Sequence, residues 1–172
     1  MDKYSIRTAM KSGRKVKDLQ CKVKTPLGNK KKGVVYRIEC ECESSVYIGE
    51  TGQRFDERKS QHQGNVNITR RDIQCGTEAS LRNAEIKMAQ GNGRMVRHAV
   101  LECDKGINWE TAKPVRQEQR VKQRKIKESI VSYQEELKGK NVLNQCYILD
   151  EGWKSILKED YNDTSGRPER RN

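Results

Sequence analysis

A chain of 172 residues is long enough for about one domain, and a content of 33% apolar and 35% charged residues leaves that domain a small core. No stretch approaches the roughly 18 apolar residues of a membrane span, and the first 20 residues lack the apolar segment of a secretory signal. These features argue against a membrane protein and predict a soluble, intracellular one.

Positive charge is concentrated at the start of the chain. Residues 1–32 hold eleven Lys or Arg and two Asp, a net charge of +9, so the other residues add only +3 to the total of +12. A basic arm on a nearly balanced domain predicts contact with DNA or RNA through counterion release, and the lack of an amphipathic stripe disfavours an anionic membrane. The alternative is a solvated tail that only keeps the protein soluble.

The first regular structure is expected just after this arm. β-Branched and aromatic runs at 34–38 and 46–48 flank the sequence "CECESS", which predicts an antiparallel hairpin. Alternation along the first strand places Val34, Tyr36 and Ile38 on one face of the sheet.

Helices are expected to follow the hairpin. Residues 54–63 are good helix formers, residues 64–77 resemble a loop, and residues 78–90 form a second helix that ends at a glycine. Residues 94–102 fit either a helix or a strand.

The longest predicted helix runs from Pro114, a residue suited to a first helical turn, to about Leu137. Its apolar side chains have the spacing of a helix that lies on a sheet. They are Ile126, Ile130, Tyr133 and Leu137. Residues 141–149 are expected to form the last strand and residues 160–172 a polar disordered tail. The elements together predict a small α/β domain with an antiparallel or mixed sheet of about three strands flanked by helices.

One set of residues suits a metal ion. The chain has two histidines, His62 and His98, and one closely spaced cysteine pair, Cys40 and Cys42. Two thiolates and two imidazoles form a closed tetrahedral zinc site, but Cys-x-Cys is tighter than the usual spacing. The pattern alone leaves zinc and a set of reduced thiols with solvated histidines as alternatives. The other cysteines are scattered singly and are interpreted as small packed hydrophobes. They are Cys21, Cys75, Cys103 and Cys146.

A second set suits phosphodiester chemistry, which needs a base to activate water, a cation for the phosphorane, and usually a carboxylate that holds a metal. Tyr36 and Tyr47 are expected on adjacent strands, Arg58 on the following helix and Glu128 on the long helix. Each residue alone is more often structural, because strand tyrosines usually pack in a core and helix arginines are usually solvated.

Taken in order, these residues resemble the GIY-YIG nuclease superfamily. "GVVY" at 33–36 stands where the first motif does, "YIG" at 47–49 is the second motif, and "RFDERKSQH" is similar to the arginine helix. Glu128 and Asn144 follow in the expected order. The resemblance is greatest to the endonuclease domain of Penelope-like retroelements, whose pattern also includes cysteines between the tyrosine motifs and segments similar to "YIGETG", "RHAVLE", "INW" and "RKIKE". It covers roughly residues 31–153.

The resemblance implies a DNA endonuclease that uses Mg²⁺, or Mn²⁺, to nick one strand and leaves a 5′-phosphate and a 3′-hydroxyl. Tyr36 would be the general base, with its pKa lowered or its proton passed on with the help of Arg58 and Mg²⁺, and Tyr47 would position water or phosphate. Arg58 would stabilise the phosphorane, Glu128 would hold the single Mg²⁺, and Asn144 would buttress the site.

The resemblance also strengthens the zinc hypothesis. It implies a structural zinc ion bound by Cys40, Cys42, His62 and His98. His62 has a second expected role, because in other GIY-YIG enzymes a histidine four residues after the arginine lies at the active site.

The predicted organisation is a basic leader at 1–32, an endonuclease domain at 33–153 and a polar tail at 154–172. DNA would bind to the active-site face and the basic arm, and the protein would work in the nucleus. Parent elements carry a reverse transcriptase, for which the leader has no room, so the chain is expected to be an excised domain or a free-standing relative. The alternatives are a structure-specific nuclease of DNA repair and a decayed, zinc-stabilised DNA-binding module.

Overall fold

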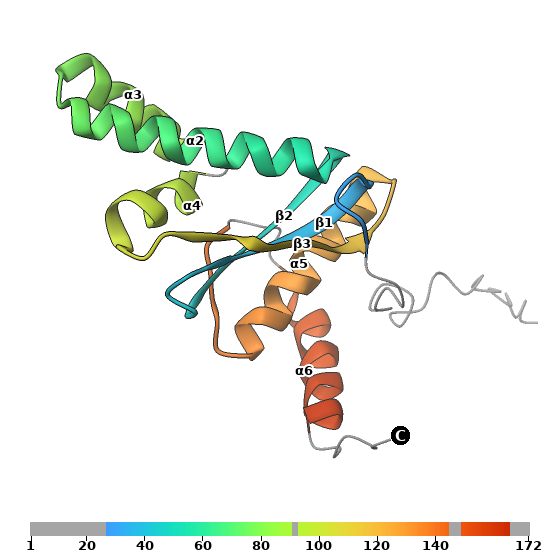
Figure 1. Ribbon diagram of the computed structural model, residues 1–172. Coiled ribbons are helices and arrows are strands. Elements are labelled where there is room, and N and C mark those ends of the chain that lie inside the picture. The colour runs from blue at the N-terminus through green and yellow to red at the C-terminus, as the bar shows by residue number, and fades with distance from the viewer. Residues whose placement is uncertain (1–26, 91–92, 145–148, 166–172) are drawn as a thin grey trace, which may run out of the picture.

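The computed structural model describes residues 27–90, 93–144 and 149–165. Within these ranges the chain forms an α/β fold with a four-stranded mixed sheet of order β3-β1-β2-β4 (Figure 1). The fold class agrees with the prediction, with one strand more than expected. The basic leader up to residue 26 lies outside the described residues.

The sheet is built around the predicted hairpin, which is confirmed. Strands β1 (Lys32–Cys40) and β2 (Ser45–Arg54) pair antiparallel. Strand β3 (Ile107–Gln117) pairs antiparallel with β1 at one edge, and the short strand β4 (Asn141–Val142) pairs parallel with β2 at the other.

Helices cover both faces of this sheet (Figure 1). They are α2 (Phe55–Cys75), α3 (Glu78–Ala89), α4 (Gly93–Arg97), the π-helical turn η1 (His98–Glu102), α5 (Val121–Leu137) and α6 (Glu151–Ser165). Alternation along β1 directs Tyr36 and Ile38 into the main core, together with Val66 of α2 and Met95 of α4. Val35 lies on the opposite face of the sheet, in the core cluster that α5 joins.

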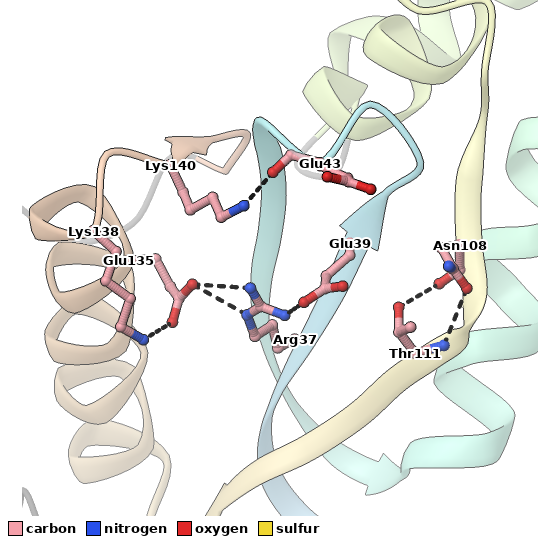
Figure 2. Close-up of polar contacts among 8 residues, drawn as sticks. All are labelled: Arg37, Glu39, Glu43, Asn108, Thr111, Glu135, Lys138 and Lys140. Carbon is pink, nitrogen blue, oxygen red and sulfur yellow. Dashed lines mark hydrogen bonds and ion pairs between the residues drawn. The ribbon is translucent and has the colours of Figure 1, made fainter. Parts of the chain in front are cut away.

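Helix α5 is fixed to the sheet by a buried ion pair (Figure 2). The guanidinium of Arg37 donates from Nε and Nη2 to Oε2 of Glu135, at 3.2 and 3.0 Å, while Lys138 Nζ donates to Oε1 at 2.6 Å. Burial alone would raise the pKa of Glu135, but the hydrogen bond from Lys138 and the charge of Arg37 hold that pKa below its usual value. The pair sets the position of the helix that also carries Glu128.

The predicted loop at 64–77 is instead helical up to Cys75. The prediction relied on Gly64 and its neighbouring asparagines, which are poor helix formers. Val66 is buried in the main core, and this packing outweighs the weak local propensity. Residues 78–90 are helical as predicted, and the ambiguous segment 94–102 is also helical.

Pro114 does not begin the long helix. It lies in β3, opposite Tyr36 and beside an irregularity in the register, and the helix begins only at Val121. Proline is tolerated in this place because β3 is an edge strand with a bulge, where one ladder hydrogen bond can be absent.

The last part of the chain is more regular than predicted. Helix α6 includes residues 151–165, and so covers much of the predicted polar tail; its Leu157 is only 2% exposed. The expected strand at 141–149 is reduced to β4, and residues 145–148 lie outside the described residues.

Candidate functional site

Tyr36 is the centre of a polar site at the junction of β1 and α2. Its side chain is fully buried, yet its Oη lies 2.7 Å from Nε2 of His62 and accepts a hydrogen bond from Nε of Arg58 at 3.4 Å. Arg58 and His62 are one turn apart on α2, so one face of the helix presents both to the phenol. The ring of Tyr47 also lies beside this site, 5.3 Å from the imidazole.

The glycine of "YIG" is explained by the same packing. Gly49 lies directly opposite Tyr36 in the β1–β2 register. A Cβ atom at Gly49 would stand 2.5 Å from Oη of Tyr36 and 2.8 Å from the ring of Tyr47. Both phenols therefore need the bare backbone of β2 at this point.

Burial dominates the electrostatics of the two tyrosines. It raises the pKa of Tyr36 and of Tyr47, and the opposing charge of Arg58 is too weak to offset it. Arg58 alone therefore does not lower the pKa of Tyr36, and the other expected route, in which the phenol passes its proton on, stays a prediction. Burial and Arg58 together lower the pKa of His62 to about 3, so its imidazole is neutral at pH 7.

Glu128 of α5 acts on the same site. Its charge contributes to raising the pKa of Tyr36 and of Tyr47, and its own pKa is raised to about 7 by burial and by the carboxylate of Glu50. Glu50 follows the "YIG" motif in β2 and forms an ion pair with Arg124, which is 4% exposed. Glu128 thus acts on both tyrosines, and Glu50 of β2 acts on Glu128.

Asn144 stands just after β4 and supports the second tyrosine strand. Its Oδ1 accepts a hydrogen bond from the backbone N–H of Ile48 at 3.3 Å. Its buried Nδ2 has no hydrogen-bond partner among the described residues. The five predicted catalytic residues thus come from four elements, β1, β2, α2 and α5, and from the segment that follows β4.

A second cluster lies at the far end of β1. The ligand atoms of Cys40, Cys42, His98 and Cys103 all lie within 4.8 Å of one another. Sγ of Cys40 is 3.2 Å from Nε2 of His98 and 3.4 Å from Sγ of Cys103. Three thiols and one imidazole form the ligand set of a closed tetrahedral zinc site, so the cluster could hold a metal such as zinc.

Local backbone structure assembles this cluster. The bend of the hairpin places Cys40 and Cys42 together, with Glu43 at a positive φ of 61°. The N–H of Cys103 donates to the carbonyl of His98 at 2.9 Å, a π-helical turn that brings residues five positions apart onto one face. Oε2 of Glu102 lies 3.4 Å from Nδ1 of His98, so Nε2 is directed toward the thiols.

The thiols of the cluster have unequal acidities. Hydrogen bonds from Ser44, Cys40 and His98 outweigh the effect of burial and lower the pKa of Cys42 to about 5. Burial raises the pKa of Cys40 to about 12. A bound cation would favour the thiolate form of each.

The predicted ligand set needs one correction. His62 is not part of the cluster, because its Nε2 faces Tyr36 from the first half of α2. Cys103 takes its place, although its isolated position in the sequence suggests a packed hydrophobe. The signal for it was the spacing His98-x₄-Cys103, which fits one face only if the turn between them is π-helical.

Comparison with known proteins gives this site no relative. No family model matches the sequence, and no curated protein and no solved structure was found to be similar to it. Among the described residues, no helix has the length and apolar character needed to cross a membrane.

Proposed function

We propose that this protein is a Mg²⁺-dependent DNA endonuclease of the GIY-YIG type, similar to those of Penelope-like retroelements, that nicks one strand. The observation that carries the proposal is the double contact of the Tyr36 hydroxyl with Arg58 and His62. A tyrosine with only a structural role does not require a partly buried arginine and a nearby carboxylate, whereas phosphodiester hydrolysis needs both.

The proton relay follows from the pKa directions. Tyr36 keeps its proton at neutral pH, because burial raises its pKa. As a water molecule attacks phosphorus, its proton passes to Oη of Tyr36 while the phenolic proton passes to Nε2 of His62. Burial, and to a smaller extent the charge of Arg58, lower the pKa of His62, and a bound phosphate would offset the second of these effects and make the imidazole a better acceptor.

Arg58 and Tyr47 serve the reacting phosphate in this proposal. The guanidinium stands beside Tyr36 and stabilises the negative charge of the phosphorane. Tyr47 retains its proton because its pKa is raised, so its hydroxyl can donate a hydrogen bond to a phosphate oxygen. The bond between phosphorus and the 3′-oxygen breaks, the released 3′-oxygen takes a proton from solvent water, and His62 returns its proton to solvent, which leaves a 5′-phosphate and a 3′-hydroxyl.

The residues present fit a Mg²⁺ ion. The pKa of Glu128 is raised to about 7 by burial and by the charge of Glu50, so a cation held by Glu128 would offset both effects. Carboxylate oxygens are also the ligands that Mg²⁺ prefers. Glu128 would hold the ion, and the ion would supply further positive charge near the scissile phosphate.

Zinc in the cysteine cluster would be structural. Four protein ligands close the coordination sphere and leave no open position for a substrate. The ion would join the end of β1 to η1 and so stabilise the strand that carries Tyr36.

Relaxation of supercoiled plasmid tests the proposed activity. We expect Mg²⁺-dependent nicking that Glu128→Gln and Arg58→Ala abolish, while DNA binding persists. Glu136→Gln and Arg71→Ala change residues of the same two helices outside the site and should nick normally. Intact supercoils after long incubation of the wild type with Mg²⁺ or Mn²⁺ would contradict the proposal and favour the decayed DNA-binding module.

A DNA substrate would also be consistent with a protein that works in the nucleus beside a reverse transcriptase.

A further inference from the structure

A pocket of about 430 Å³ opens where the second half of α2 faces η1 and the loop that leads into β3. This volume lies in the range of ligand-binding pockets. Its lining combines one aromatic ring with two cationic and two other polar side chains. They are Trp109, Arg70, Lys105, Asn67 and Asp104.

The chemistry of the lining suits a nucleotide. Trp109 is partly exposed and packs against the main core, so its ring is held in place. Nη2 of Arg70 donates to the carbonyl of Ala99 at 3.3 Å, which fixes the guanidinium at the pocket. An aromatic ring on which a base can stack, next to two cations for its phosphate, is the usual arrangement for single-stranded nucleic acid. Asp104 adds an acceptor for an exocyclic amino group of the base.

The pocket lies along the same helix as the tyrosine site. Arg58 and Arg70 are separated on α2 by a rise of about 18 Å. That rise corresponds to about five nucleotide steps of a DNA strand. A strand whose phosphate lies at Arg58 would reach the pocket if it also turned around α2, because Arg70 lies about 120° further around the helix axis.

The wall of the pocket is tied to the metal cluster. Cys103 belongs to both, and the carbonyl of Gly106 accepts a hydrogen bond at 3.0 Å from the N–H of Glu41, which lies between the ligands Cys40 and Cys42. Metal binding at the cluster would thus hold the loop that carries Lys105 in one conformation.

We propose that this pocket binds one unpaired nucleotide of the DNA substrate, about five steps from the cleaved phosphate. A paired base is stacked inside the duplex and cannot enter such a pocket. The inference rests on the proposed nuclease function and names its substrate class, which is DNA with an extrahelical or single-stranded nucleotide near the nick.

The test compares two duplexes of the same sequence, one of which carries an extra unpaired adenine. Binding is measured without Mg²⁺ on the full chain with Glu128→Gln and Trp153→Phe, which leaves Trp109 as the only tryptophan. We expect the bulged duplex to quench the fluorescence of Trp109 and to bind about tenfold more tightly than the paired one.

Matched variants assign this preference to the pocket. Lys105→Glu and Arg70→Gln should abolish it, whereas Lys113→Glu and Arg71→Gln, which change exposed residues outside the lining, should keep it. Equal binding of the two duplexes, or a preference that survives both pocket variants, would overturn the inference. If the protein nicks plasmid but does not prefer the bulged duplex, the pocket inference is wrong and the nuclease proposal stands. If the protein prefers the bulged duplex but does not nick plasmid, the pocket binds nucleic acid and the nuclease proposal is wrong.

Discussion

Gly49 has the least room for change among the residues of the tyrosine site. In Gly49→Ala the new methyl group would overlap Oη of Tyr36 and the ring of Tyr47. We expect a loss of about 1–3 kcal/mol in the free energy of unfolding, measured in urea, together with slower nicking, because the phenol must move away from His62.

Gly64→Ala is the matched control. A Cβ atom at Gly64 has no neighbour within 4 Å, and the residue lies inside α2. Alanine should therefore stabilise the helix by about 0.5–1 kcal/mol. An unfolding free energy of Gly49→Ala equal to that of the wild type would mean that the phenols are packed more loosely than described.

Glu128 makes stability depend on pH. Its pKa is about 7 in the folded protein and about 4.3 in an unfolded chain. A raised pKa stabilises the fold below pH 4, and this contribution is lost as the pH rises through 7. Glu128→Gln cannot ionise, so its advantage over the wild type should grow between pH 5 and pH 8, by on the order of 1–2 kcal/mol after discounting for solvent screening.

Urea unfolding at both pH values measures this difference without reference to activity. At pH 8, Mg²⁺ should raise the unfolding free energy of the wild type and leave that of Glu128→Gln unchanged. The same advantage at both pH values would show that the carboxyl is not perturbed.

The metal cluster gives a prediction for the elements that it joins. If the cluster binds zinc as proposed, Cys103→Ser should lose zinc, measured by elemental analysis, and should lower the melting temperature by roughly 10 °C, because a bound ion would contribute directly to folding. His62→Gln should retain one zinc per chain. Cys75→Ser, which changes an exposed cysteine outside the cluster, should retain both zinc and stability. Zinc absent from His62→Gln and present in Cys103→Ser would restore the ligand set first expected from the sequence.

Sequence patterns predicted the elements where local and long-range preferences agree. The alternating strands around "CECESS" are of this kind, and so are the two tyrosines on adjacent strands. The patterns failed where tertiary packing decides. Gly64 suggested a loop, although Val66 of the same helix is buried in the main core. Pro114 suggested the start of a helix, although the structure places it in an edge strand, which tolerates proline.

The ligands of the cluster were predicted only in part for a similar reason. Cys40 and Cys42 are close in sequence, so their pairing was visible. The partnership of His98 with Cys103 depends on a π-helical turn, which no propensity indicates. His62 has the residue type of a ligand, and only the fold shows that its ring faces Tyr36.

At the scale of the whole molecule, the proposed DNA binding gives the basic arm a testable role. A truncated variant that begins at residue 27 would lack eight of the eleven Lys and Arg residues of the arm. We expect this variant to nick plasmid but to bind DNA more weakly. The slope of log K for DNA binding against the logarithm of the salt concentration should become shallower by about 0.9 for each phosphate that the arm no longer neutralises. Binding measured over a range of salt concentrations checks this prediction. An unchanged slope would mean that the arm does not contact DNA and is only a solvated tail.

The cluster of cysteines and histidine also joins the two ends of a long segment of the chain. Cys42 and His98 are far apart in sequence, yet Sγ and Nε2 lie 3.8 Å apart, so the segment between them departs and returns at one point. The far ends of α2 and α3 extend beyond the sheet (Figure 1), and the turn at Gly76 has open space around it. Insertions at that turn would leave the tyrosines where they are. Evolution can therefore lengthen the protein there, and so add new binding surface, without rebuilding its chemistry.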